Sequence, residues 1–281
     1  MPGHPFELVD VFADGAFSGN PLAVVTLDAE IETEQMQRIT RWLNLSETTF
    51  LLPPTDPGAD YRVRIFTLER ELPFAGHPTL GTCHAWLGAG GAPRGGMVVQ
   101  QCGAGLIPIR RDGEMLAFAA PPLVREGPVE PVLLVELAAI LQIDPDEIVA
   151  AQWVDNGPGW VAVQLGSAAA VLALEPMRAP GRHIDFGVVG FHPPGGEVLY
   201  EVRAFFSDAN GVLLEDPVTG SLNASLAQWL VGTGQARPPY SAAQGTQLGR
   251  SGRVRVTADG AKQLWIGGRT QTMFSGTTGL L

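Results

Sequence analysis

The sequence predicts an α+β protein in two similar halves, each wrapping its strands around one long helix. Three observations predict this fold class: one pattern occurs twice, strands follow one another in hairpin-like runs, and a proline-rich stretch separates the halves. Strands that alternated with helices would instead predict a Rossmann-type parallel sheet.

The repeated pattern is an Arg-x-Phe strand that leads through an acidic loop to a turn of small residues opening a helix. The first copy contains Arg64 and Gly76, and the second contains Arg203 and Gly220. When the two glycines are aligned, 144 positions apart, further glycines after each helix also coincide. A repeat of this length indicates two similar halves that face each other across a cleft.

The first half contains two predicted helices among several predicted strands. The helices are expected where apolar residues recur every three or four positions, and one of them begins at a proline and stops at a glycine. Apolar patterns predict strands at 6–13, 22–27, 48–52, 61–67, 97–101 and 106–111, and helices at 33–43 and 78–87.

The second half begins after four prolines that lie between positions 121 and 131, which we interpret as a linker. We therefore place the halves at 1–124 and 125–281, with the extreme C-terminus free to pack on the first half. The second half is predicted to contain helices at 132–142, 145–151 and 221–231, and strands at 159–165, 199–206 and 253–257.

Composition excludes several classes of function. The net charge of −11 argues against nucleic acid and against anionic membrane, although a local site could still bind a small anionic metabolite. No apolar run reaches the ~18–20 residues that a membrane-spanning helix needs. The chain has two cysteines, too few for a disulfide framework, so a soluble cytoplasmic protein is expected.

No cofactor or metal is expected either. The one lysine, Lys262, lies in a turn-like segment unsuited to a pyridoxal-phosphate Schiff base. The sequence contains no phosphate-binding loop, no dinucleotide-binding loop after a strand, and no Cys/His cluster with metal-ligand spacing.

The two glycine turns, at Gly76 and Gly220, are the first candidate site. The first turn of a helix carries unpaired N–H groups and the positive end of the helix dipole, and two such ends could bind a carboxylate and stabilise an enolate-like charge. The alternative interpretation is a pair of ordinary capped helices, with His77 as a capping or packing residue.

Two carboxylates complete the candidate set. Glu47 stands before an apolar strand, and a carboxyl group beside apolar surface tends to keep its proton, which suits it to proton transfer. Asp216 precedes the second glycine turn and could orient a histidine or a substrate amine or hydroxyl. The alternatives are a solvated glutamate at a strand end and an acidic residue favoured near a helix N-terminus.

Four motifs, in matching order and spacing, resemble the phenazine-biosynthesis PhzF-like family. They are Asp10-Val11-Phe12 with Gly19-Asn20-Pro21-Leu22-Ala23-Val24, Ser46-Glu47-Thr48-Thr49-Phe50, Pro73-Phe74-Ala75-Gly76-His77-Pro78-Thr79 and Glu215-Asp216-Pro217-Val218-Thr219-Gly220-Ser221. The resemblance covers nearly the whole chain. It implies the diaminopimelate-epimerase type of fold: two pseudo-symmetric domains, each a curved, mostly antiparallel sheet around a central helix, with the active site between them, and commonly a homodimer.

The resemblance also implies roles for individual residues. Glu47 matches the proton shuttle, and His77 and Asp216 match the residues that position the substrate and assist proton movement. The remaining matches are to substrate-binding positions: Gly76, Gly220, Ser221, Asn20, Ser46 and Thr219. The epimerase branch carries a cysteine before each glycine of the twin turns, where this chain has Ala75 and Thr219.

The resulting expectation is a cofactor-independent isomerase that moves a proton between carbons of a small carboxylate-bearing substrate resembling dihydro-hydroxyanthranilate. Two alternatives stay open. One is a racemase or epimerase that does not use two cysteines, and the other is a catalytically idle binding protein that kept the fold.

Overall fold

The computed structural model describes residues 3–179, 181 and 183–279. The chain forms two compact units. The first comprises the residues up to Ala119 together with those from Gly267 onward, and the second comprises Ala120–Ile266. The end of the chain therefore belongs to the first unit. No helix within the described residues combines the length and apolar character needed to cross a membrane.

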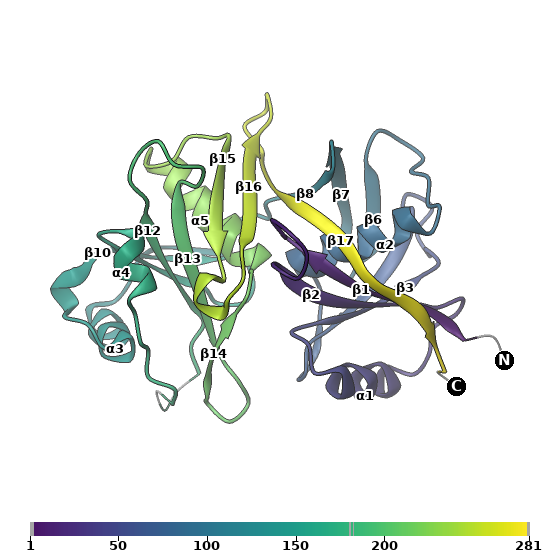
Figure 1. Cartoon of the computed structure of the whole chain (residues 1–281), viewed down its shortest axis with the longest axis horizontal. Helices are drawn as coiled ribbons and strands as arrows, with labels where there is room; N and C mark the ends of the chain where they lie inside the picture. The colour runs from purple at the N-terminus through teal and green to yellow at the C-terminus, as the bar shows by residue number, and fades with distance from the viewer. Residues whose placement is uncertain (1–2, 180, 182, 280–281) are drawn as a thin grey trace. The chain divides into compact units, whose positions relative to one another are not determined.

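The first unit is a mixed sheet whose strands surround one helix (Figure 1). Its elements are β1 (His4–Val11), β2 (Asn20–Thr26), α1 (Thr33–Leu43), β3 (Thr48–Leu52), β4 (Tyr61–Phe66), β5 (Glu71–Leu72), α2 (Gly76–Gly88), β6 (Val98–Cys102), β7 (Gly105–Asp112) and β8 (Met115–Ala119), with β17 (Leu264–Thr278) entering from the second unit.

The pairings of the first unit run in a closed circuit. The order is β17, β1, β2, β3, β4, β6, β7 and β8, and β8 pairs again with β17. Figure 1 shows β1 and β17 lying side by side, in purple and yellow. The β2–β3 and β4–β6 pairs are parallel, and the other registered pairs are antiparallel. Helix α2 contacts strands of this circuit on several sides, and almost all of its first ten residues are buried.

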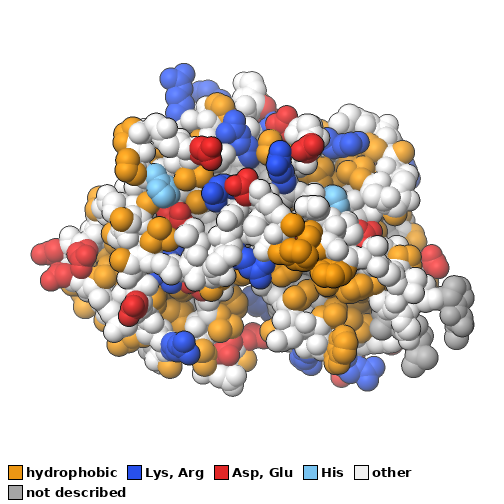
Figure 2. Space-filling view, in the orientation of Figure 1, with side chains coloured by type: hydrophobic (Ala, Val, Ile, Leu, Met, Phe, Trp, Pro, Cys, Tyr) orange, Lys and Arg blue, Asp and Glu red, His pale blue; other side chains and the backbone are white. Residues whose placement is uncertain are grey.

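Burial of α2 follows from its sequence, which is apolar or small on every side rather than along one stripe. Helix α1, by contrast, is strongly amphipathic and lays Met36 on a core with Val25, Phe50 and Phe66. One face of the sheet therefore packs on α2 and the other on α1. Exposed hydrophobic side chains gather over the part of β17 that crosses β1 (Figure 2).

The second unit is also a mixed sheet. It contains β9 (Arg125–Pro128), α3 (Pro131–Leu141), the 3₁₀ helix η1 (Pro145–Glu147), β10 (Ile148–Asp155), β11 (Val161–Leu165), α4 (Ala168–Leu172), β12 (Phe186–Phe191), β13 (Tyr200–Ser207), β14 (Leu213–Asp216), α5 (Gly220–Gly232), β15 (Tyr240–Gln244), the 3₁₀ helix η2 (Thr246–Leu248) and β16 (Gly252–Ala258).

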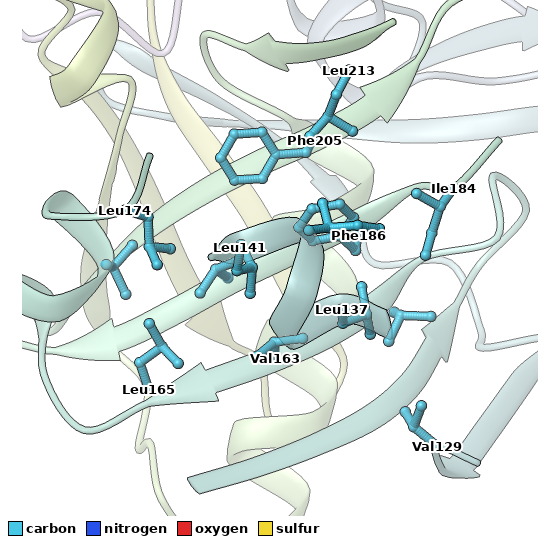
Figure 3. Packing of buried hydrophobic residues seen from close by; sticks show 14 residues of the cluster. Val129, Leu137, Leu141, Val163, Leu165, Leu174, Ile184, Phe186, Phe205 and Leu213 are labelled. Carbon is cyan, nitrogen blue, oxygen red and sulfur yellow. The ribbon is translucent and has the colours of Figure 1, made fainter. Parts of the chain in front are cut away.

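The strands of the second unit pair in the order β9, β10, β11, β12, β13, β15 and β16, with parallel pairs at β11–β12 and β13–β15. Helix α5 is buried along most of its length and contacts β10 and β16. Helices α3 and α4 cover a separate core, in which Leu137 and Leu141 pack with Phe186 and Phe205 (Figure 3).

The same side-chain arrangement occurs on the hairpin that precedes each buried helix. Arg64 makes two hydrogen bonds to the Glu71 carboxylate, and Arg203 makes the same two bonds to Glu215. Each guanidinium also lies over the phenylalanine two residues further on, at 5.2 and 5.0 Å from the ring centroid. The motif Arg-x-Phe therefore has a local physical role in both units: it ties the hairpin that leads to the helix start.

One of the predicted helices is wrong. The helix predicted at 145–151 is a single 3₁₀ turn followed by β10, because residues 148–151 pair with β11. The proline-rich stretch predicted as a linker begins just after the division between the two units at Ala119 and Ala120, and it also contains β9, whose Pro128 lies opposite Gln152. Strands β5, β8, β12, β14, β15 and β17, helix α4 and the 3₁₀ helix η2 were not predicted.

Buried acidic groups make the folded chain sensitive to alkali. Burial raises the pKa of the Cys83 thiol from 9.0 to about 12, and burial likewise raises the pKa of Tyr240 from 10.0 to about 12. Both groups are acids whose neutral form is kept in the folded chain. The unfolded chain therefore releases their protons first, and stability falls as pH rises from each ordinary pKa toward each raised one.

We expect the free energy of unfolding to fall by about 1 kcal/mol between pH 9 and 10 from Cys83 alone, and more steeply above pH 10. Urea unfolding from pH 8 to 11 measures this slope. The variant Cys83→Ala should lose the part of the slope between pH 9 and 10, and an unchanged slope in that variant would contradict the assignment.

Candidate active site

The start of α2 carries a closely spaced carboxyl–imidazole pair. Nδ1 of His77 lies 3.1 Å from Oε2 of Glu47. The His77 side chain is 3% exposed and that of Glu47 is 17% exposed, so Glu47 is the more accessible member of the pair. The pair joins the residue after Gly76 in the helix to the residue before β3.

Strand pairing explains why these residues meet. Strands β2 and β3 are parallel, with Ala23 opposite Thr48, so their N-terminal ends lie at the same end of the sheet. Glu47 and Asn20 stand at those two ends, and α2 begins beside them. Ser46, half-buried, precedes Glu47 in the same turn. The predicted residues Asn20, Ser46, Glu47, Gly76 and His77 are thus grouped in the first unit.

The second ring nitrogen of His77 fixes the protonation of the first. Nε2 lies 3.1 Å from the backbone carbonyl oxygen of Asn20. A carbonyl oxygen can only accept, so Nε2 must carry a hydrogen. Nδ1 and the Glu47 carboxyl then need one proton between them, because an ionised carboxylate facing a bare Nδ1 would place two lone pairs in contact. The Glu47–His77 pair is therefore a one-proton couple.

The start of α2 has no side-chain cap. The residue before it is Ala75, in extended conformation, and Pro78 in the first turn has no N–H to satisfy. The interpretation of His77 as a capping residue is therefore wrong, since its two ring nitrogens contact Glu47 and Asn20. The first N–H groups of the helix have no side-chain acceptor and are suited to an anion.

The start of α5 in the second unit has a different polar arrangement. Thr219 is a residue type that usually caps helices, yet its hydroxyl makes no cap and instead donates to Oδ2 of Asp216 at 2.6 Å. The Gln244 side chain donates to the Thr219 hydroxyl and to the Asp216 carbonyl, and its oxygen accepts from the Thr219 N–H. Asp216 is thereby held beside the start of the helix.

Ser221, the residue after Gly220, is held by the loop between β10 and β11. The indole N–H of Trp160 donates to the Ser221 hydroxyl at 3.0 Å, and the Asn156 amide donates to its carbonyl at 2.9 Å. The predicted residues Asp216, Thr219, Gly220 and Ser221 are thus grouped in the second unit.

Sequence reasoning missed three residues of this second group: Gln244, Asn156 and Trp160. Each reaches the start of α5 from a distant part of the chain through sheet pairing, and none belongs to a motif at helix-start spacing. A buried glutamine in the apolar strand 240–244 was the one available signal, because a fully buried amide needs polar partners.

The described residues contain no group of three His, Cys, Asp or Glu side chains placed to hold a metal ion. Cys83 is buried within α2, and Cys102 lies at the end of β6. Neither thiol occupies the position before a helix-start glycine, where Ala75 and Thr219 stand.

Comparison with known proteins identifies the family of the chain. The family model for phenazine biosynthesis-like proteins (PhzC-PhzF) matches residues 9–276. The trans-2,3-dihydro-3-hydroxyanthranilate isomerase of Pseudomonas aeruginosa is 36% identical, with 92% of this chain and 91% of that protein covered. Antisense-enhancing sequence 1 of Schizosaccharomyces pombe is 34% identical over 98% of this chain and 99% of that protein.

A solved structure shows the same fold. The phenazine biosynthesis protein of the PhzF family from Enterococcus faecalis superposes with a TM-score of 0.80 at 25% identity, covering 99% of this chain and 100% of that one. The chain therefore belongs to the phenazine biosynthesis-like family and is an enzyme of the isomerase class.

Proposed function

We propose that the chain is a cofactor-independent isomerase that moves a proton between two carbons of a small carboxylate-bearing ring, of the trans-2,3-dihydro-3-hydroxyanthranilate kind. The observation that carries this proposal is the one-proton couple of Glu47 and His77 at the uncapped start of a buried helix. The 36% identity to an isomerase named for that substrate supports the substrate class.

In the proposed reaction Glu47 is the general base and then the general acid. When the shared proton lies on Nδ1, His77 is an imidazolium and Glu47 is an ionised carboxylate, held together by the short contact. The carboxylate removes a proton from one ring carbon, the electron pair of the broken C–H bond moves into the ring, and Glu47 returns the proton to another carbon. The imidazolium offsets the negative charge that develops.

We further propose substrate-binding roles for the residues at the start of each helix, taking each unit by itself. The N–H groups of Gly76 in the first unit, and those of Gly220 in the second, are each suited to a substrate carboxylate, and the Ser221 hydroxyl would add a donor or acceptor beside Gly220. Asp216, held by Thr219, would accept from a substrate amine or hydroxyl. Asn20 and Ser46 would line the site beside Glu47.

Turnover in deuterated water tests the proposal. Incubated with trans-2,3-dihydro-3-hydroxyanthranilate in H₂O, the protein should give an isomer of unchanged mass. In D₂O the product should carry at most one carbon-bound deuterium, because one carboxyl group transfers one proton at a time. Mass spectrometry and proton NMR of the product provide the measurement.

Two outcomes would contradict the proposal. If the protein did not convert trans-2,3-dihydro-3-hydroxyanthranilate, the proposed substrate class would be wrong. Exchange of an α-hydrogen with inversion of configuration, on a chiral amino acid in the same assay, would instead establish a racemase or epimerase that works without the two-cysteine arrangement.

A further inference from the structure

Asp10 is a buried carboxylate that the proposed reaction does not use. It lies near the end of β1 and is 3% exposed. Its Oδ2 accepts from the Ser18 N–H at 2.8 Å, and its Oδ1 accepts from the Gly19 N–H at 2.9 Å. Both oxygens are therefore committed to the backbone at the far end of the loop that joins β1 to β2.

This loop adopts a backbone that needs to be held. Phe12 and Phe17 both have positive φ, 61° and 62°, a conformation that side chains with a Cβ rarely adopt. Gly19 has no room for a side chain, since a Cβ would lie 2.1 Å from the Val11 carbonyl oxygen and 2.8 Å from Oδ1 of Asp10. The loop is thus drawn tightly onto the end of β1 at the residue that Asp10 binds.

The held segment ends at the residue that contacts His77. Asn20 follows Gly19 directly, and its carbonyl oxygen is the acceptor for Nε2 of His77. The position of that carbonyl is therefore set one peptide away from the Asp10 clamp. Because the carbonyl fixes the hydrogen on Nε2, it also decides that Nδ1 is the nitrogen sharing a proton with Glu47.

The second unit contains the same device. Asp155 ends β10, and its Oδ1 accepts from the N–H groups of Gly157 and Gly159, both at 2.7 Å. The loop that it holds supplies the Asn156 contact to Ser221. In each unit, then, an aspartate at the end of a strand clamps a loop that contacts the residue after the helix-start glycine.

We propose that Asp10 is a positioning residue that holds His77 as its Nε2–H tautomer by clamping the backbone of residues 18–20. The expected effect of Asp10 on catalysis rests on the proposed function. Its expected effect on the tautomer of His77 rests on the geometry alone. The proposal gives a role to the motif that contains Asp10 and Gly19, a motif that proton transfer by Glu47 does not explain.

The variant Asp10→Asn tests this role. An amide keeps one acceptor and turns an NH₂ donor toward the other backbone N–H, so one of the two clamping bonds is replaced by a repulsive contact. The carbonyl of Asn20 should then move away from Nε2. We expect kcat to fall about 10- to 100-fold, as small misplacements of reacting groups do, with KM changed less than kcat.

The decisive readout is the ¹⁵N NMR signature of His77, which requires no substrate. Long-range ¹H–¹⁵N spectra of histidine-labelled protein, with His77 assigned from a His77→Gln variant, should show the hydrogen on Nε2 in the unaltered chain. In Asp10→Asn the same ring should show both tautomers. The matched control is Ser18→Ala, which removes the hydroxyl that binds Asp14 and Gly15 but keeps the N–H that Asp10 holds. Its His77 signals should not change.

The outcomes are separable. An Nδ1–H tautomer in the unaltered chain would overturn the inference even if Asp10→Asn failed to fold. Unchanged His77 signals in a folded Asp10→Asn variant would also overturn it. If instead the His77 signals changed as expected while Glu47→Gln kept full activity, the proposed function would fail and the positioning role of Asp10 would stand.

Discussion

Replacing Glu47 with Gln should lower kcat on a dihydro-hydroxyanthranilate substrate by about 10²- to 10⁴-fold, the usual contribution of a general acid–base group. Glutamine has nearly the same shape, and its amide can still donate to Nδ1 of His77 across the 3.1 Å contact. The fold and substrate binding should therefore be kept, while the transferable proton is lost.

Single-turnover and steady-state assays, with the melting temperature measured alongside, provide the test. The matched control is Glu69→Gln, since Glu69 is an exposed glutamate in the turn between β4 and β5. Its kcat should equal that of the unaltered chain. Full turnover by Glu47→Gln would show that another group transfers the proton.

The second large effect is expected on stability, from the paired arginine–glutamate contacts. Glu215→Gln should lower the free energy of unfolding by about 3–5 kcal/mol, because it leaves the Arg203 guanidinium buried without its carboxylate. The two side chains are only 7% and 10% exposed. Arg203 also donates to the carbonyls of Val171 and Leu174, so it cannot turn outward without losing those bonds.

The first unit supplies the matched control. Glu71→Gln removes the corresponding carboxylate from Arg64, but Glu71 is 37% exposed and Arg64 keeps a second carboxylate, Glu30, at 2.8 Å. The expected loss is about 0–1 kcal/mol. Urea unfolding of both variants decides the matter: equal losses would show that burial does not separate the two contacts.

Local sequence patterns predicted the helix starts well. Gly76 and Gly220 each open a helix of 13 residues that ends at a glycine. Small residues favour both starts, and Pro78 in the first turn favours the start of α2. Asp216 and Thr219 were correctly expected near the second start, since they precede it by a few positions. The helix starts and the residues just before them depend on neighbours in the sequence, so the sequence alone was enough to predict them.

Features that depend on distant pairing were missed. Strand β17 contains glycines and polar residues that give no strand signal, and it is ordered by its pairing with β1 at the other end of the chain. Residues 148–151 were predicted as helix, but their pairing with strand β11 overrides that local preference. The contact between Glu47 and His77 likewise depends on the packing of α2 against β2 and β3, although both residues were singled out individually.

The backbone acceptor of His77 has a consequence for where protons can travel. Nε2 donates to the backbone carbonyl oxygen of Asn20, and this group takes no proton at ordinary pH. The imidazole therefore cannot pass a proton on to solvent through Nε2. Every proton that His77 gains or loses must pass through Glu47. Protons therefore enter and leave the Glu47–His77 pair through the Glu47 carboxyl group alone. A proton that Glu47 takes from a bound molecule would return to that molecule before it exchanges with water.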